Sequence, residues 1–346
     1  MLINLMKQGV SSMKVAAFGE VLLRLATKKG VLISNSNEFN LNFGGGETNV
    51  LVSLSNFGVE TRMITKISED SFGDGMLSYL KSKSIDTNYI IRGEGRTPIY
   101  FLEVGSGNRN SKVIYDRKNS VFSSICSEEI EIEEALRDID ILHFSGITLA
   151  ISEEVRKLTF KILEHCKKNN ILVSYDSNYR AKMWSLEEAS NATKMILPYV
   201  NILSAGILDA ENILNMRCDL EDKYKKLEYY YDEITKKYTN IKHIYSSIRE
   251  IKSASVNTLQ SNYYKEGKLH SSKIYEIDDI VDRIGGGDAL TSGILYGIIA
   301  NKSSEYISEF SVVASVLKHS IYGDANLVSI EDIENIMNNG VSRVGR

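Results

Sequence analysis

The chain has 346 residues, of which 43% are apolar, so it can bury the core of one large domain or of two modest ones. Its formal net charge of -4 provides no basic surface for nucleic acid. No apolar run reaches the roughly 18 residues that span a membrane. We therefore expect a globular protein that binds neither nucleic acid nor membranes.

The N-terminal residues and the cysteines indicate where in the cell the protein acts. Residues 1–12 lack the apolar core and the cleavage site of a signal peptide, so we expect a short tail, and Met13 could be the natural start. The 3 cysteines have no C-x-x-C spacing and favour reduced thiols in a cytoplasmic protein. The 5 histidines lack zinc-motif spacing, and we expect no zinc site.

Strand-like and helical patterns alternate along the chain. Apolar strands that alternate with helices predict a mainly parallel sheet covered on both faces. The expected strands are residues 14–26, 61–68, 139–147, 171–178 and 200–205. The expected helices are residues 48–58, 71–85, 152–170 and 185–200, with Gly58 ending the first of them.

Two stretches interrupt this alternation. Residues 97–105 and 111–117 are alternating strands with no helix between them, which predicts an antiparallel ribbon forming a flap on the main sheet. Residues 257–277 predict a second hairpin around Gly267. Residues 221–239 predict a charged amphipathic helix.

The stretch "VDRIGGGDALTSG" places three glycines, Gly285, Gly286 and Gly287, immediately before Asp288 and an apolar helix. Glycines at a helix N-terminus let backbone amides approach an anion, and the helix dipole favours negative charge there. An aspartate would repel a bound phosphate, unless it accepts a proton from a hydroxyl that attacks a phosphoryl group held by the amides. The alternative is that Asp288 only caps the helix.

These residues resemble the D-T-x-G-A-G-D signature of the ribokinase-like, or PfkB, carbohydrate kinases, with Arg283 for Thr and Gly286 for Ala. The stretch "NFGGGETN" resembles the second signature of that family, a double glycine followed by an asparagine and a helix. Neither stretch matches the P-loop or the G-x-G-x-x-G motif. The resemblance extends from about residue 14 to about residue 336.

The resemblance implies a three-layer α/β/α sandwich with a mainly parallel central sheet and a small β-sheet lid. It implies one kinase domain over residues 13–336, with lid strands from about 20–43 and 97–120. It further implies that ATP is the phosphoryl donor, that Asp288 is the catalytic base and that the Gly285–Gly287 amides form the anion hole. A bound monovalent cation and a homo-oligomer formed through the lid are consistent with the same resemblance.

The middle of the chain resembles the 2-keto-3-deoxygluconate kinases of this family, through "YDSNYRAKMW", "HFSGITLAIS" and "VIYDRKNS". A keto-deoxy acid carries a carboxylate, which Arg117 and Arg180 could grip with two parallel hydrogen bonds. Tyr100 and Tyr115 could offer hydroxyls or an apolar wall, and Gly45 lets a sugar lie against the backbone. The alternatives are a solvated charge for Arg117 and a salt bridge to Asp176 for Arg180.

The remaining candidates rest on weaker matches. Asp324 matches a late acidic position that approaches the far end of the substrate in this family, or else it forms a turn. Arg249, in "SSIREIKSAS", is expected near the nucleotide phosphates. The family motif N-x-x-E, which helps to hold magnesium through water, is replaced by Gly206 and Asp209, so we expect magnesium with ATP but an altered arrangement around Asp209.

Three functions are compatible with these features. A 2-keto-3-deoxygluconate kinase that forms the 6-phosphate accounts for both arginines. A fructokinase or another sugar kinase of the same fold would leave Arg117 and Arg180 without a carboxylate. A catalytically weak sugar-binding regulator would fit the altered magnesium motif, but binding alone has no need of a base such as Asp288.

Overall fold

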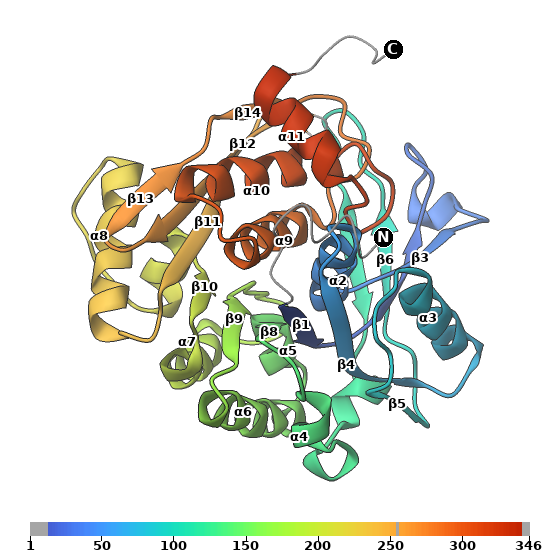
Figure 1. Ribbon diagram of the computed structural model, residues 1–346. Coiled ribbons are helices and arrows are strands. Elements are labelled where there is room, and N and C mark those ends of the chain that lie inside the picture. The colour runs from blue at the N-terminus through green and yellow to red at the C-terminus, as the bar shows by residue number, and fades with distance from the viewer. Residues whose placement is uncertain (1–12, 254–255, 341–346) are drawn as a thin grey trace.

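A 10-stranded sheet forms the centre of the computed structural model, which describes residues 13–253 and 256–340 (Figure 1). The strand order is β13-β12-β11-β10-β9-β8-β1-β4-β5, and β14 also pairs with β12. Pairing is parallel from β11 to β5 and antiparallel around β12. The strands are β1 (Lys14–Phe18), β4 (Glu60–Ser68), β5 (Ile90–Gly93), β8 (Ile141–Ser145), β9 (Leu172–Asp176), β10 (Ile202–Ser204), β11 (His243–Ile251), β12 (Asn257–Lys265), β13 (Lys268–Ser271) and β14 (Tyr275–Ile277). The tail expected at residues 1–12 lies outside the described residues.

Helices cover both faces of this sheet, as the alternation in the sequence predicts (Figure 1). They are α2 (Gly46–Asn56), α3 (Ser71–Ser82), α4 (Ile132–Ala135), α5 (Gly146–Ile151), α6 (Glu153–Lys168), α7 (Leu186–Ile196), α8 (Lys223–Lys237), α9 (Gly286–Ile299), α10 (Ser304–Lys318) and α11 (Ile330–Asn339). The short turns are η1 (Ile33–Asn35), η2 (Val121–Ser124), η3 (Ser127–Glu129), η4 (Leu197–Tyr199) and the π-helical η5 (Asp209–Ile213). No helix in the described part of the chain is long and apolar enough to cross a membrane.

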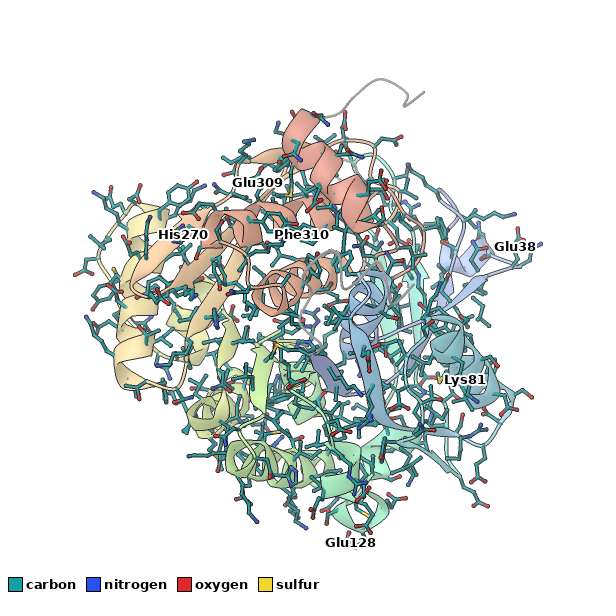
Figure 2. The ribbon with its side chains drawn as sticks, viewed as in Figure 1. Glu38, Lys81, Glu128, His270, Glu309 and Phe310 are labelled. Carbon is teal, nitrogen blue, oxygen red and sulfur yellow. The ribbon has the colours of Figure 1, made fainter. Side chains whose placement is uncertain are left out.

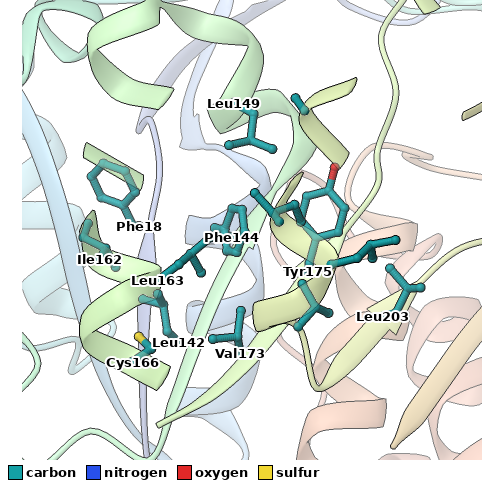
Figure 3. Close-up of a cluster of buried hydrophobic side chains, with 14 of the residues drawn as sticks. Phe18, Leu142, Phe144, Leu149, Ile162, Leu163, Cys166, Val173, Tyr175 and Leu203 are labelled. Carbon is teal, nitrogen blue, oxygen red and sulfur yellow. The ribbon is translucent and has the colours of Figure 1, made fainter. Parts of the chain in front are cut away.

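Two hydrophobic cores lie on opposite faces of the sheet, because successive side chains of a strand point in opposite directions. In β1, Ala16 and Phe18 belong to one core, whereas Val15 and Ala17 belong to the other. Figure 3 shows the first core, in which Phe18, Phe144 and Tyr175 pack with side chains of α6. The second core packs α2, α9 and α10 against the sheet.

The side chains follow the same division between interior and surface. Phe310 of α10 is fully buried, whereas Glu38, Lys81 and Glu128 project at the periphery (Figure 2). Several helices begin at a capping side chain. Ser185, for example, accepts a hydrogen bond from the backbone of Glu188, whose carboxylate accepts one from the backbone of Ser185.

A second sheet of four strands, with order β3-β2-β6-β7, lies beside the main sheet near α2 and α3 (Figure 1). It contains β2 (Leu22–Ala26), β3 (Asn40–Gly44), β6 (Ile99–Glu103) and β7 (Lys112–Asp116). The ribbon expected at 97–105 and 111–117 is β6 and β7, which pair antiparallel with Tyr100 opposite Tyr115. The strand-like residues 14–26 divide between the two sheets as β1 and β2. We call this second sheet the lid sheet.

Candidate active site

The glycine–aspartate turn begins α9 with a residue in a left-handed conformation. Gly285 is the N-cap of α9 and has φ of +80°. A Cβ atom at this position would lie 1.7 Å from the carbonyl oxygen of Asp324, so only glycine fits here. Nothing lies within 4 Å of a Cβ built on Gly287, which leaves that side of the turn open for a ligand. The turn therefore has the form of the expected anion cradle.

A second helix N-terminus meets the same place. Gly45 is the N-cap of α2, with φ of +133°, and a Cβ there would lie 2.4 Å from the Glu20 carbonyl oxygen. Glu47 in the first turn of α2 accepts hydrogen bonds from the Ser145 hydroxyl at 2.6 Å and the Thr148 hydroxyl at 2.8 Å. These bonds fix the start of α2 at the end of β8. Two helix dipoles thus direct their positive ends at one region.

Asp288 lies in the first turn of α9 and links it to α2. Its Oδ2 accepts a hydrogen bond from Asn49 Nδ2 at 2.7 Å. The N-cap position belongs to Gly285, so Asp288 is not the helix cap that we considered as an alternative. Burial raises the pKa of Asp288 to about 7, with a smaller contribution from the charge of Asp176, while the bond from Asn49 lowers it. A carboxylate with a pKa near the working pH suits a general base.

The expected site residues line one cavity of about 380 Å³ between α9, α2 and the lid sheet. All substrate, nucleotide and catalytic candidates lie on its wall, whereas Asp209, the residue expected near the metal, does not. The candidates on the wall are Gly45, Tyr100, Tyr115, Arg117, Arg180, Arg249, Gly285, Gly286, Gly287, Asp288 and Asp324. The sequence reasoning missed Asn49, Asp176, Asn178 and Arg283 as lining residues. Asn49 could have been found, because it stands in the "GGGETN" signature.

Asp324 is the centre of a buried polar cluster. Arg24 Nη1 donates to its Oδ1 at 2.6 Å, and the Tyr100 hydroxyl donates to its Oδ2 at 2.5 Å. Arg24 Nη2 also donates to Asp282 at 2.6 Å. Both Asp324 oxygens therefore have protein donors, and a contact to a substrate would compete with them. The only sequence signal for Arg24 was a charge inside the apolar run "VLLRLA".

The two arginines expected to bind a carboxylate have different surroundings. Arg117 is buried, and its Nη2 lies 2.5 Å from Glu20 Oε2, so it is not the solvated charge of the alternative. Burial raises the pKa of Glu20, and the charge of Arg117 opposes this. Arg180 is exposed, and its Nη1 donates to the Tyr179 carbonyl at 3.3 Å. Within the described residues Arg180 makes no salt-bridge contact with Asp176, contrary to the alternative considered for it, although its charge lowers the pKa of that acid.

Two acids lie at the carboxyl edge of the main sheet beside the cavity. Asp176 ends β9, opposite Ser145 of β8 and Ser204 of β10. Burial raises the pKa of Asp176 to about 6, and the charge of Asp209 adds to the rise. Asp209 Oδ2 accepts from the Gly206 amide at 2.8 Å, and burial raises the pKa of Asp209 as well.

No group of three or more His, Cys, Asp or Glu side chains in the described part of the chain could hold a metal ion. Mg²⁺ that arrives with a nucleotide needs only one or two carboxylates, since it keeps most of its waters and binds phosphate oxygens. Asp176 and Asp209 meet that requirement, because a cation would relieve the repulsion between their charges. Glu211 points elsewhere, since its Oε1 accepts from the Tyr230 hydroxyl of α8 at 3.0 Å.

Arg249 and Arg283 supply positive charge to the wall beside the glycine turn. Arg249 lies on β11 opposite Leu259 of β12, and it is exposed to solvent. Arg283 directly precedes Ile284 and the three glycines. Two residues of the expected nucleotide stretch "SSIREIKSAS", at 254–255, lie outside the described residues.

Residues 12–329 match the model of the pfkB family of carbohydrate kinases. The chain belongs to this family. It is a carbohydrate kinase, and the resemblance in the two glycine motifs is confirmed. The fold predicted from that resemblance is confirmed as well.

Individual relatives share the architecture over nearly the whole chain. A crystal structure of 2-dehydro-3-deoxygluconokinase from Thermotoga maritima is 36% identical, has a TM-score of 0.90, and covers 94% of this chain and 99% of that one. A protein named 2-dehydro-3-deoxygalactonokinase from Haloferax volcanii is 25% identical over 96% of this chain and 99% of its own length. A putative ribokinase II from E. coli, solved with ATP and Mg²⁺, is 16% identical with a TM-score of 0.76, and covers 94% of this chain and 99% of that one.

The position of Asp288 leads to a prediction for the catalytic step. Asp288→Asn keeps the size of the side chain and an acceptor for Asn49 but removes the base. We expect kcat to fall by roughly 10²–10⁴, with KM for both substrates nearly unchanged. Steady-state kinetics of the purified variant test this. Retention of more than about a third of the wild-type kcat would contradict a catalytic role for Asp288.

The raised pKa of Asp288 predicts two dependences on pH. Because the base acts when deprotonated, kcat/KM for the sugar should rise through a pH of about 7 and then level off. The pH profile of kcat/KM measures this.

The raised pKa also affects stability. An aspartate with a raised pKa makes the folded state less stable as the pH rises from the pKa of the unfolded state to the pKa of the folded state. Asp288→Asn should therefore melt at a higher temperature than wild type at pH 8, and this difference should shrink toward pH 4. A lower melting temperature of the variant at pH 8 would show that Asp288 stabilises the fold in its charged form.

Proposed function

We propose that this kinase transfers the γ-phosphoryl group of ATP to a hydroxyl of a 2-keto-3-deoxy sugar acid, with 2-keto-3-deoxygluconate and its 6-phosphate as the leading substrate and product. The observation that carries the proposal is that Arg117 and Arg180 line the same cavity as Asp288. A base at one wall and guanidinium groups at another suit a substrate with a hydroxyl at one end and a carboxylate at the other. The names of the Thermotoga maritima and Haloferax volcanii relatives agree with this substrate class.

In the proposed reaction, Asp288 accepts the proton of the attacking hydroxyl. The Gly285–Gly287 amides at the N-terminus of α9 stabilise the charge on the transferring phosphoryl group. Arg249 and Arg283 lie on the same wall, where they can bind nucleotide phosphates. Mg²⁺ brought by ATP would supply further charge neutralisation, and Asp176 and Asp209 are the residues that would hold its waters.

The two arginines have unequal parts in this proposal. Arg117 is already neutralised by Glu20, so it presents a fixed and partly compensated charge. Arg180 is exposed, and its one hydrogen bond in the described residues goes to a carbonyl, so its guanidinium can reach a carboxylate in the cavity. Its charge also acts on Asp176, whose pKa it lowers. We infer that Arg180 distinguishes sugar acids from neutral sugars.

The lid sheet bears the exposed apolar side chains of Leu41 and Ile114, and the exposed Phe39 directly precedes β3. Monomeric proteins rarely leave large contiguous apolar patches in water. We therefore propose that the lid sheets of two subunits associate in a homo-oligomer.

We also propose that residues 13–336 form a single kinase domain, and that the protein acts in the cytoplasm.

A fructokinase or another kinase for neutral sugars is the main alternative. Such a substrate would leave Arg180 without a charged partner. A sugar-binding regulator would need no base with a raised pKa beside an anion cradle. A coupled assay of ATP consumption, run on a panel of keto-deoxy sugar acids, fructose and ribose, tests these functions. Turnover of a neutral sugar at a higher kcat/KM than any sugar acid would refute the proposal.

Arg180 provides a prediction for specificity. Arg180→Ala removes a charge-assisted contact of about 1.5–3 kcal/mol, so KM for the sugar acid should rise by roughly 10- to 150-fold. KM for any neutral sugar that the enzyme accepts should change much less. Lys182→Ala is the matched control, because Lys182 has the same charge two residues further on but does not line the cavity that holds Asp288. Equal increases for acid and neutral sugars would show that Arg180 does not bind the carboxylate.

Asp209 provides a prediction for the metal. Asp209→Ala should shift the magnesium requirement to higher concentration, while the rate at saturating magnesium falls less, because ATP and the glycine amides still hold the phosphoryl group. Magnesium titrations of wild type and variant measure the shift. Glu211→Gln is the control, because it keeps an acceptor for Tyr230 and should leave the curve unchanged. Coincident curves for wild type and Asp209→Ala would rule out a role for Asp209 at the metal.

A further inference from the structure

Lys318, the last residue of α10, is completely buried. Lysine is almost never fully buried unless its ammonium is paired, because charge is poorly solvated in a protein interior. Here Nζ donates to the carbonyl oxygens of Asp282 and Ile321, each at 3.2 Å. The ammonium is thus held by backbone carbonyls, and none of the catalytic steps above uses it.

The two carbonyls belong to the segments that build the anion cradle. Asp282 lies three residues before Gly285, and Ile321 lies three residues before Asp324. The segments are also joined by the Val281 amide, which donates to the His319 carbonyl at 2.9 Å. Gly285 passes directly beneath the Asp324 carbonyl oxygen. A shift of either segment would therefore move the amides at the start of α9.

Two buried carboxylates beside Lys318 favour a cation at this point. Arg24 binds both Asp282 and Asp324, so one guanidinium faces two buried carboxylates. With both carboxylates ionised, Arg24 compensates one negative charge, and the Lys318 ammonium is the further cation bonded to the backbone of Asp282. Burial lowers the pKa of Lys318, whereas the charges of Asp282 and Asp324 raise it. The two carbonyl acceptors of Nζ, which has no acid among the described residues within hydrogen-bond distance, suit an ammonium group at this place.

We propose that the Lys318 ammonium is a built-in monovalent cation that positions the Gly285–Gly287 anion hole, so that phosphoryl transfer needs no added potassium. An ammonium group and K⁺ are similar in size, and carbonyl oxygens can take the place of water around either. The sequence alone left a bound monovalent cation open, and the position of Lys318 supplies a tethered substitute. Lys318 is a positioning residue in this scheme, and the inference rests on the proposed kinase reaction.

The wild-type enzyme provides the first test. Activity is measured with the Tris salt of ATP in choline chloride, and then with choline replaced by K⁺, Na⁺ or Cs⁺ at constant ionic strength. We expect kcat to vary by less than twofold across these salts. Activation by K⁺ of fivefold or more over choline would overturn the inference, because the site would then need an external ion.

Chemical rescue provides the second test. Lys318→Ala should lose at least tenfold in kcat in choline chloride, with KM for the sugar changed by less than twofold. Added ammonium, methylammonium or K⁺ should recover at least a third of the lost activity. An unchanged kcat in choline, or a loss that no cation restores, would show that Lys318 has only a structural role.

Lys66→Ala is the matched control. Lys66 of β4 is also buried, but its Nζ lies 2.6 Å from Glu129 of η3, and neither residue lines the cavity that holds the glycine turn. Its removal should leave kcat insensitive to the choice of monovalent cation. Lys318→Met keeps most of the volume of the side chain and serves if the alanine variant does not fold. Its kcat should fall in choline like that of the alanine variant, and a wild-type kcat would overturn the inference.

A readout without turnover separates this inference from the proposed substrate. The melting temperature of Lys318→Ala should rise more with K⁺ or ammonium than with choline, and this difference should be absent in wild type. If no compound of the substrate panel is phosphorylated, the proposed function fails, yet the melting data still decide the role of Lys318. Identical responses of wild type and variant to these salts would overturn the inference.

Discussion

The double ion pair of Arg24 is the interaction on which the active site depends. Arg24 belongs to the lid sheet, whereas Asp282 precedes α9 and Asp324 follows α10, at positions 258 and 300 residues further along the chain. Removing one partner of a buried ion pair typically costs about 3–5 kcal/mol, because the remaining charge is left without compensation. The pairing therefore fixes the lid strand, the glycine turn and the segment beneath it in one arrangement. Tyr100 extends this connection to β6 through its bond to Asp324.

The packing that positions Asp288 between α2 and α9 also sets the pKa of its carboxyl group. The N-termini of α2 and α9 converge because Gly45 and Gly285 adopt conformations that side chains disfavour. Their convergence buries Asp288 between them, and burial is the largest cause of its raised pKa. The positive helix ends that can hold a phosphoryl group and the base that can activate its acceptor thus arise from one packing arrangement. A more open site would lower the pKa of Asp288 and weaken it as a base.

The sequence predicted the parts of this site that depend on local pattern. The glycine turn with Asp288 was recognisable because glycines before an apolar helix have a specific backbone role, and the ribbon with Tyr100 and Tyr115 was recognisable from its alternation. The partners Arg24 and Lys318 were not predicted. Arg24 is one charge within an apolar strand, and Lys318 stands in the last helical turn, where a lysine usually complements the helix dipole in solvent. Only the long-range packing shows that both are buried counterions, and the same holds for Glu20, which neutralises Arg117.

The cationic side chains around this cavity fall into two groups, those that are buried and paired and those that are exposed. Arg24, Arg117 and Lys318 are buried and bound to acids or carbonyls, so their charge is used in holding the fold. Arg180 and Arg249 are exposed on the cavity wall, where solvated guanidinium groups attract anions and can exchange water for a carboxylate or phosphate. Asp176 and Asp209 lie beside them and would repel ATP in the absence of a cation. In the proposed function, Mg²⁺ that arrives with the nucleotide would relieve this repulsion, with Asp176 and Asp209 as the residues that would hold its waters. Arg249 would then be free to bind phosphate oxygens, while Arg180 would bind the carboxylate of the sugar acid. Replacement of the exposed arginines can therefore alter which substrates bind. It would leave intact the buried ion pairs that hold Asp288 and the glycine turn in their relative positions.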